Sequence, residues 1–403
     1  MTDNNENKVL NVPHLRFPEF SGEWEMVSLQ DIATINPKSD PLQNTFIYID
    51  LEAVEKGELR KIQEIMREEA PSRAQRVIDN NDILFQCVRP YQKNNYIHRI
   101  LNTSNQQWVA STGYAQIRTT ELPNYIYHLL NTDEFNRKVM VRCTGSSYPA
   151  INSEDLATIH FYYTPDKKEQ LKISRLLDLL DKRIATQNKI IEKLQSLIKG
   201  LNDSLYKQYG NAITTSFSDF GYSYSGLSGK SADDFGSGKP FITYLNVYSN
   251  NVVDENDYQY VCINEEEKQN VVKYGDVLFT LSSETPEEVG VGSVYLGKEE
   301  VYLNSFCFGI HIENTRLAYS PYLSYYVAST PFRKFIYPFA QGSTRFNLCK
   351  ADFEKASIKL PSLENQKHIY AVLSRITEKT ETERTLLRHY TTQKQYLLRQ
   401  MFI

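Results

Sequence analysis

The sequence predicts an α+β protein in which two pseudo-symmetric mixed α/β domains are separated by two long helices packed as an antiparallel coiled coil. Two observations lead to this prediction. The second half of the chain repeats landmarks of the first half at a nearly constant distance. Each half also contains a long stretch whose apolar residues recur at alternating steps of four and three, which is the pattern of a heptad seam.

The repeat is clearest in a turn with its strand and in one loop. Residues 79–86 (DNNDILFQ) recur as residues 273–280 (KYGDVLFT), an offset of 194, and both read as a turn that enters a buried strand. The loop GSSYPAI at 145–151 matches GSTRFNL at 342–348, an offset of 197. Chance alone does not readily produce two long matches at so similar an offset.

A third landmark follows each loop, and the chain can then be divided. Pro165, Gln170 and Ile173 are echoed 196 residues later by Pro361, Gln366 and Ile369. We therefore expect two related domains of about 130 residues, each followed by a helix. The predicted segments are an N-terminal tail (1–20), a first domain (21–150), a connecting region with the first long helix (151–210), a second domain (211–345) and a connecting region with the second long helix (346–403).

The two long helices are predicted from Lys168 and from about Leu363. The first seam runs about 40 residues without proline, so at about 1.5 Å per residue its helix spans roughly 60 Å. Such a stripe needs a partner, and the natural one is the other helix of the chain, packed antiparallel; self-association between chains stays an alternative. The residues expected to pack are Ile173, Leu177, Leu180, Ile184, Ile191, Leu194, Ile198, Ile369, Leu373, Ile376 and Leu387.

Composition excludes several classes of protein. The chain has no apolar stretch of 18 residues and no signal-peptide pattern, so we expect a cytoplasmic protein without a membrane partner. Its five cysteines are scattered singly, which favours reduced packing residues over a metal site. The net charge of −4 argues against coating nucleic acid through bulk positive charge, so any DNA contact must be local.

Catalytic motifs are missing as well. The chain has no G-x-S-x-G, H-E-x-x-H or G-x-G-x-x-G motif, and no Asn-Pro-Pro-aromatic run of the adenine methyltransferases. The segment SGLSGKS at 225–231 invites comparison with a phosphate loop, but the glycine required five residues before Gly229 is Tyr224. We therefore predict no catalytic residue, no metal and no cofactor in this chain.

The loop after the first buried strand carries groups that suit DNA. Arg89, Tyr91, Lys93 and Asn94 combine hydrogen-bond donors with an aromatic ring. Such a mixture fits phosphate contacts together with hydrogen bonds to base edges. An ordinary solvated loop has a similar composition, and this alternative stays open.

The repeated glycine loops and two stretches of the second domain complete the DNA-binding candidates. Hydroxyls and backbone N–H groups in the glycine loops are suited to phosphate, although a structural turn between domain and helix explains them equally well. The stretches of the second domain read as a flexible loop and as the residues that follow the strand at 275–279. The candidates are Ser146, Ser147, Ser343, Thr344 and Arg345 in the glycine loops and Ser228, Lys230, Ser282 and Ser283 in the second domain.

Two variable domains, each followed by a repeated helical region, resemble the specificity subunit of type I restriction-modification systems. The resemblance covers almost the whole chain. It is carried by the opening LRFPEF at 15–20 with Trp24, the strand GDVLF at 275–279, the Gly342-Ser343-Thr344 loop, and the segments 165–170 and 361–366 that lead into the helices. The first half departs from the pattern at Asn81, where the second half has Gly275.

The resemblance implies a division of labour. The two domains would be target recognition domains that read the two halves of an interrupted double-stranded DNA target, while the helices set the spacer and dock two methyltransferase subunits. Restriction subunits would join that core. S-adenosylmethionine, ATP and Mg²⁺ are expected in the partner subunits and not in this chain. Base-reading residues cannot be carried over, because the family's recognition domains vary in sequence.

Two other functions compete with this one. The first is a coiled-coil protein-interaction scaffold with two ligand-binding domains; it is favoured by the acidic second domain, where residues 211–345 hold 9 basic against 16 acidic residues, a charge of −7. The second is a self-sufficient modification enzyme, which the missing cofactor and catalytic motifs argue against.

Overall fold

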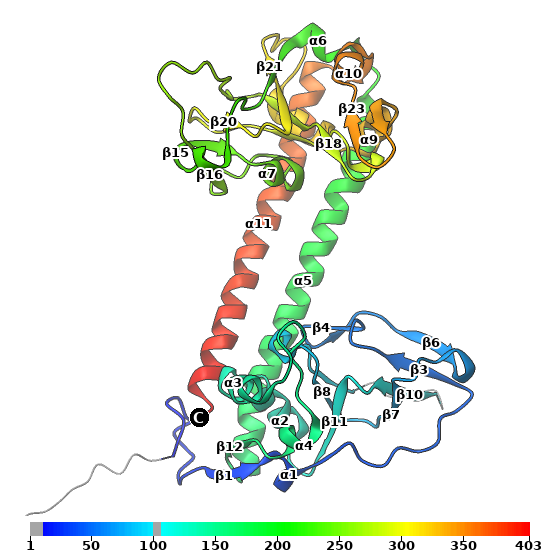
Figure 1. The fold of residues 1–403 in the computed structure, drawn as a ribbon, viewed down its shortest axis with the longest axis vertical. Helices are drawn as coiled ribbons and strands as arrows, with labels where there is room; N and C mark the ends of the chain where they lie inside the picture. The colour runs from blue at the N-terminus through cyan, green and yellow to red at the C-terminus, as the bar shows by residue number, and fades with distance from the viewer. Residues whose placement is uncertain (1–10, 100–105) are drawn as a thin grey trace, which may run out of the picture. The chain divides into compact units, whose positions relative to one another are not determined.

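The computed structural model describes residues 11–99 and 106–403, so the first half of the predicted N-terminal tail lies outside the described residues (Figure 1). The chain forms two compact units. Unit 1 comprises residues 1–188 and 385–403, and unit 2 comprises residues 189–384. The long helix α5 (Lys167–Tyr209) begins in unit 1 and ends in unit 2, whereas α11 (Leu363–Gln400) begins in unit 2 and ends in unit 1.

Unit 1 is built around two four-stranded sheets. The first sheet is antiparallel, and the second contains one parallel pair, β3 with β10. Their strand orders are β2 (Ala33–Ile35), β11 (Tyr114–Thr119), β8 (Ile83–Gln86), β9 (Tyr96–Ile97), and β6 (Gln63–Met66), β3 (Thr45–Ile49), β10 (Gln107–Ser111), β7 (Ala74–Val77). Two short pairs are β1 (Glu25–Ser28) with β12 (His160–Tyr163), and β4 (Val54–Glu55) with β5 (Glu58–Leu59). The helices are α1 (Leu29–Ile32), η1 (Arg67–Glu69), η2 (Pro90–Gln92), α2 (Pro123–Leu130), α3 (Asp133–Arg142) and α4 (Ser153–Ala157).

Unit 2 contains a corresponding set of elements. Its antiparallel sheet has the order β14 (Gly221–Ser225), β21 (Cys307–Ile312), β17 (Val277–Thr280), β19 (Gly292–Val294). Two three-stranded sheets follow the orders β16 (Tyr258–Val261), β15 (Phe235–Ile242), β20 (Tyr302–Leu303), and β18 (Ser282–Ser283), β23 (Phe346–Leu348), β22 (Ala340–Gly342). One pair joins β13 (Ile213–Thr215) to β24 (Ile358–Leu360). The helices are α6 (Phe217–Phe220), η3 (Ala232–Asp234), α7 (Tyr244–Ser249), η4 (Pro286–Glu288), α8 (Ser320–Tyr326), α9 (Thr330–Ile336), η5 (Tyr337–Phe339) and α10 (Lys350–Lys355).

The internal repeat predicted from the sequence is confirmed in three dimensions. All four residues of β8 and of β17 are buried, and each strand pairs with the strand that follows it by about 30 residues, β11 or β21. The repeated glutamines make the same contacts: Gln170 Oε1 accepts the backbone N–H of Leu122, and Gln366 Oε1 accepts that of Tyr319. Each therefore ties the segment before α2 or α8 to the start of a long helix.

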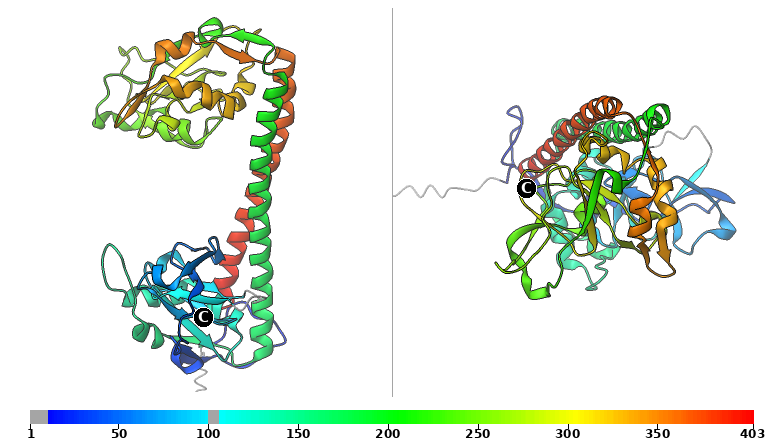
Figure 2. Two further views of the ribbon diagram at one scale, coloured as in Figure 1. Left: turned by 90° about the vertical axis from the view of Figure 1, so that its right-hand side faces the viewer. Right: turned by 90° about the horizontal axis from the view of Figure 1, so that it is seen from above.

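The long helices pair in opposite directions within each unit. In unit 1 the first half of α5 meets the end of α11, where Lys394 forms an ion pair with Asp181 at 2.5 Å. In unit 2 the second half of α5 packs with the start of α11, because Ile198 and Leu201 contact the core cluster that contains Leu373. Within each unit the two ribbons lie beside one another (Figure 2). The antiparallel arrangement predicted from the heptad seams is confirmed.

The seam separates buried from exposed leucines along the helices. Leu177 and Leu373 are fully buried, whereas Leu179, which lies off the seam, is 59% exposed. The other residues expected to pack are buried (Ile173, Leu180, Ile191, Ile369) or half-buried (Ile184, Leu194, Ile198, Ile376, Leu387).

The opening sequence motif is anchored in unit 1 on both long helices. The Arg16 guanidinium binds both oxygens of the buried Glu169 carboxylate on α5, at 2.7 and 2.9 Å. The backbone N–H of Leu15 donates to the carbonyl of Gln400, at the end of α11. Trp24 lies in the core with its ring centroid 6.1 Å from that of Phe402. The motif thus joins the start of α5 to the end of α11 within unit 1.

Two classes of feature are missing from the part of the chain that the structure describes. None of its helices is long and apolar enough to cross a membrane. Over the same residues, 11–99 and 106–403, His, Cys, Asp and Glu side chains form no cluster that could hold a metal ion.

Candidate nucleic-acid interface

The loop that follows β8 in unit 1 is tightly braced. Arg89 and Lys93 both adopt left-handed backbone conformations, with φ of 54° and 53°, which a side chain with a Cβ adopts only at a cost of about 1–3 kcal/mol. The side chain of Gln86 holds the loop from inside, because its Oε1 accepts the N–H of Asn94 and its Nε2 donates to Gln92. Such strain persists only where neighbouring contacts fix the loop.

The glycine loop of unit 1 is a hairpin that lies against this braced loop. Thr144 pairs with Ala150, and Ala150 also pairs with Val88, two residues after the end of β8. The N–H of Arg89 donates to the carbonyl of Pro149 at 2.7 Å, and its guanidinium carbon lies 4.3 Å from the centroid of the Tyr148 ring. The predicted candidates Arg89, Ser146 and Ser147 are therefore brought together, with both serines exposed.

The other candidates of unit 1 are placed differently. Tyr91 is 51% exposed on η2, so its ring is available to a ligand. The Lys93 ammonium forms an ion pair with Asp133 at 2.7 Å, and the hydrogen bond from Lys93 lowers the pKa of that carboxyl. Asn94 Oδ1 accepts the N–H of Lys56. Lys93 and Asn94 thus have partners within unit 1, on the side of the loop that faces other protein segments.

The glycine loop of unit 2 is the equivalent hairpin, between β22 and β23. Its second arm pairs with β18, so that Ser282 lies opposite Asn347 and Ser283 opposite Phe346. Gly342 has φ of 147°, and a Cβ there would lie 2.1 Å from the Arg345 carbonyl oxygen. The position therefore requires glycine if the turn is to keep its shape. Ser343 and Thr344 are exposed at its tip.

A cation and an aromatic ring meet beside this hairpin too. The Arg345 guanidinium carbon lies 5.9 Å from the centroid of the Phe306 ring, which is 56% exposed. The Phe306 backbone is fixed on both sides, because its N–H donates to Asn304 Oδ1 and its carbonyl accepts the N–H of Leu281. Tyr148 and Phe306 were not identified from the sequence, because their partners, Arg89 and Arg345, lie 59 and 39 residues away along the chain.

The remaining candidates of unit 2 point into the protein or lie elsewhere on it. Ser282 and Ser283 are buried, and the Ser283 hydroxyl donates to Glu288 at 3.0 Å. Lys230 forms an ion pair with Glu267 at 2.5 Å and donates to the Cys262 carbonyl, leaving its side chain 4% exposed. Ser228 is exposed, but its backbone is held by Gln269. Ser228 and Lys230 follow β14, apart from the hairpin sheet.

A buried carboxylate that the sequence did not single out anchors the central strand of each unit. Asp82 accepts the backbone N–H of Asp79 and two hydrogen bonds from Arg118, whose pKa it raises. Asp276 accepts the N–H of Lys273 at the equivalent turn. Burial raises the pKa of Asp276, against the hydrogen bonds that it accepts. These carboxylates fix the starts of β8 and β17, and the candidate DNA-binding segments lie near the other ends of these strands.

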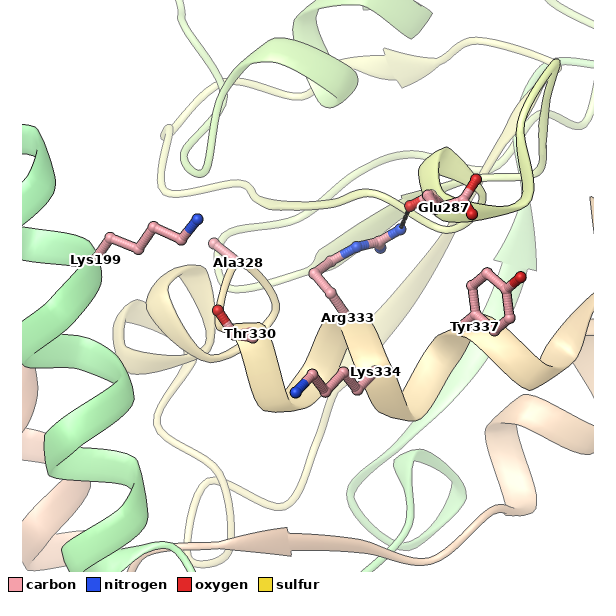
Figure 3. Close-up of a pocket in the computed structure, with 7 residues that line it drawn as sticks. All are labelled: Lys199, Glu287, Ala328, Thr330, Arg333, Lys334 and Tyr337. Carbon is pink, nitrogen blue, oxygen red and sulfur yellow. Dashed lines mark hydrogen bonds between the residues drawn. The ribbon is translucent and has the colours of Figure 1, made fainter.

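Unit 2 also contains a cavity of about 530 Å³ between α5, α9 and η4 (Figure 3). The Arg333 guanidinium donates to the carbonyls of Glu287, Val289 and Gly290 at 2.6–2.8 Å, so its donors serve the fold. Lys199 and Lys334 line the same cavity. Tyr337 closes one side and is 47% exposed.

Comparisons with known proteins give a consistent answer. The chain is 22% identical over 194 residues to the HindI specificity subunit of a type I restriction enzyme from Haemophilus influenzae; the match covers 47% of this chain and 38% of that subunit's length. Two solved structures share its fold. One, from a study of complex assembly and conformational transition of the type I R-M system, is 20% identical, with a TM-score of 0.58 over 93% of this chain and 96% of that chain. The S subunit of a type I system from M. genitalium is 12% identical, with a TM-score of 0.55 over 97% and 99%.

The family assignment rests on both halves of the chain. The model of the type I restriction modification DNA specificity domain matches residues 21–196 and, a second time, residues 227–389. These two matches contain both hairpins, the buried central strands β8 and β17, and most of both long helices. This chain belongs to the family of type I restriction-modification DNA specificity domains, of which it carries two copies.

Proposed function

We propose that this protein is the specificity subunit of a type I restriction-modification complex, in which each unit reads one half of an interrupted double-stranded DNA target. The observation that carries the proposal is the double family match together with the equivalent hairpins of the two units. Two related readers on one chain are suited to a target made of two separate parts.

The partners follow from the same proposal. Two methyltransferase subunits would dock on this chain, restriction subunits would join them, and the connecting helices would set the spacer between the half-sites. S-adenosylmethionine, ATP and Mg²⁺ would be bound by those partners, and this chain would be non-catalytic and act in the cytoplasm. The exposed hydroxyls and guanidinium groups of the hairpins would contact phosphates and base edges.

The decisive experiment is co-expression with a methyltransferase subunit of a type I system from the same genome, in a host that lacks other adenine methylation, followed by genome-wide mapping of methylated adenines. We expect one interrupted motif with a methylated adenine in each half. The purified chain alone, incubated with labelled S-adenosylmethionine and DNA, serves as the control and should transfer no methyl group.

Two outcomes would contradict the proposal. A stable complex that methylates no motif would favour the protein-interaction scaffold, the alternative that the acidic charge of the second domain supports. Turnover by the purified chain alone would instead make it a modification enzyme in its own right.

A further inference from the structure

Each unit holds one arginine against an exposed aromatic ring at the same place in its fold. In unit 1 the pair is Arg89 with Tyr148, and in unit 2 it is Arg345 with Phe306. The offset of the glycine loops makes Tyr148 and Arg345 equivalent positions, so the hairpin supplies the ring in one unit and the arginine in the other. Both units thus place an arginine against a ring at the hairpin, but the partner of the hairpin residue comes from the loop after β8 in unit 1 and from the segment before β21 in unit 2.

Both pairs lie where the buried central strand ends. Arg89 follows β8 by three residues, and Phe306 directly precedes β21, whose Cys307 pairs with Thr280 at the end of β17. The segments are joined by backbone hydrogen bonds, from Arg89 to Pro149 in unit 1 and from Leu281 to Phe306 in unit 2. The segments that carry Arg89 and Phe306 are therefore fixed by backbone hydrogen bonds at the ends of the central strands.

The donors of these two guanidinium groups are free. Neither Arg89 nor Arg345 forms a side-chain hydrogen bond or an ion pair with another of the described residues. Lys93, in the same loop as Arg89, is by contrast paired with Asp133. A planar group with five donors, held over a ring, can still offer its outer edge to a ligand.

The ligand that best fits such an edge on DNA is guanine. A guanidinium donates two parallel hydrogen bonds to O6 and N7 of guanine in the major groove, the commonest sequence-specific contact to DNA. Exposed hydroxyls at both hairpin tips could bind a phosphate of the same DNA strand. Ser343 and Thr344 directly precede Arg345 in sequence, whereas Ser146 and Ser147 belong to the hairpin that Arg89 contacts.

We propose that Arg89 and Arg345 each read one guanine, one in each half of the DNA target, and that Tyr148 and Phe306 orient the two guanidinium groups. This inference rests on the proposed function and adds to it the residues that determine specificity. It also commits each half-site to contain at least one guanine whose major-groove edge is essential.

The experiment uses the complex of the full chain with its methyltransferase, in four variants. Arg89→Ala and Arg345→Ala remove the reading groups. Arg137→Ala removes an exposed arginine of unit 1 that is paired with Glu134, and Arg316→Ala removes an exposed arginine of unit 2 that follows the opposite end of β21. Each complex is assayed for genome-wide adenine methylation and for binding to a duplex that contains the mapped motif.

A chemical substitution in the DNA identifies the contacted base. Each guanine of the motif is replaced in turn by 7-deazaguanine, which lacks the N7 acceptor. For the wild-type complex we expect one position in each half where the replacement weakens binding, because the hydrogen bond to N7 is lost while O6 still accepts one. Arg89→Ala removes both hydrogen bonds, so it should weaken binding to unmodified DNA more strongly, by roughly 5- to 150-fold, the range of a good bidentate contact, and lose its sensitivity at one of these positions. Arg345→Ala should do the same at the other.

The orienting role of the rings has its own readout. Tyr148→Phe keeps a ring face under Arg89 and should preserve the motif, whereas Tyr148→Ala should lower affinity without changing which guanine responds to 7-deazaguanine. If the wild-type complex methylates an interrupted motif, but Arg89→Ala and Arg345→Ala behave like the two control variants, the inference is wrong and the proposed function stands. If the wild-type complex methylates no motif, the proposed function itself fails.

Discussion

The Nδ1 atom of His311 lies 2.8 Å from the carboxylate of Asp276, on the strand position where unit 1 places Arg118 against Asp82. The two halves of the duplication have thus kept the buried acid and changed its partner. In unit 2 the Tyr224 hydroxyl donates to the same carboxylate at 2.7 Å. The acid closes the turn before the central strand in both units, which explains why it is the constant member of the pair.

Removing this acid should destabilise unit 2. Asp276→Ala leaves the Lys273 N–H, the Tyr224 hydroxyl and His311 without their acceptor, and unpaired buried groups cost about 1–3 kcal/mol each. We expect the free energy of unfolding to fall by about 3 kcal/mol in urea titrations. Asp233→Ala, at an exposed position of the same unit, is the control and should change it by less than about 0.5 kcal/mol. Equal midpoints for the two variants would remove the structural role.

The pH dependence of unit 1 should carry the signature of His128. Burial lowers the pKa of His128 below its usual 6.5, so the folded protein keeps the imidazole neutral, with Nε2 2.9 Å from Asp178. The unfolded chain gains a proton as the pH falls below about 6.5, whereas the folded chain gains it only at a lower pH. Stability that is present above this pH should therefore be lost on acidification, by up to about 1.4 kcal/mol per pH unit.

The test is a comparison of thermal unfolding between pH 7.5 and 5. His128→Gln offers Asp178 an amide donor but cannot titrate, so its stability should change less with pH than that of the wild type. Parallel curves would show that His128 does not contribute. The pKa of Asp178 is also lowered, by the hydrogen bonds from His128 and Asn124 against the opposing effect of burial, and its contribution would be lost only at more acidic pH.

The turn of the unit 2 hairpin should keep its conformation only with glycine at position 342. Gly342→Ala places a Cβ 2.1 Å from the Arg345 carbonyl oxygen and must displace the turn that carries Arg345. Gly229→Ala is a matched control, because Gly229 also has a positive φ, of 65°, but no atom within 4 Å of the added Cβ. Methylome mapping should show altered or lost recognition of one half-site for Gly342→Ala alone. An unchanged motif would mean that the hairpin does not contact DNA.

The heptad seam can be tested with two leucines of one helix. Leu177→Ala removes a fully buried side chain from the core of unit 1, and such changes cost about 2–5 kcal/mol. Leu179→Ala changes a side chain that is 59% exposed and should cost less than about 0.5 kcal/mol. Denaturant unfolding distinguishes the two. A similar loss for both variants would place the helix in a different register.

The sequence predicted the repeat, both long helices and their seams, because periodic patterns and turn residues are local signals. It did not predict that Asp133 and Glu267 neutralise Lys93 and Lys230, since these pairs form between residues 40 and 37 positions apart. The aromatic partners of Arg89 and Arg345 were missed for the same reason. The composition of a loop can predict that it contacts DNA. Which of its side chains have no hydrogen-bond partner within the protein can be seen only in the folded structure.

Because unit 1 includes residues 385–403, its core can be completed only after unit 2 has been synthesised. The 196 residues of unit 2, 189–384, leave the ribosome in between, which takes roughly 10–40 s at bacterial elongation rates. During that time the surface that Phe402 will cover, around Trp24 and Tyr125, stays open to water. During translation, the order of the segments along the chain therefore completes unit 2 before unit 1.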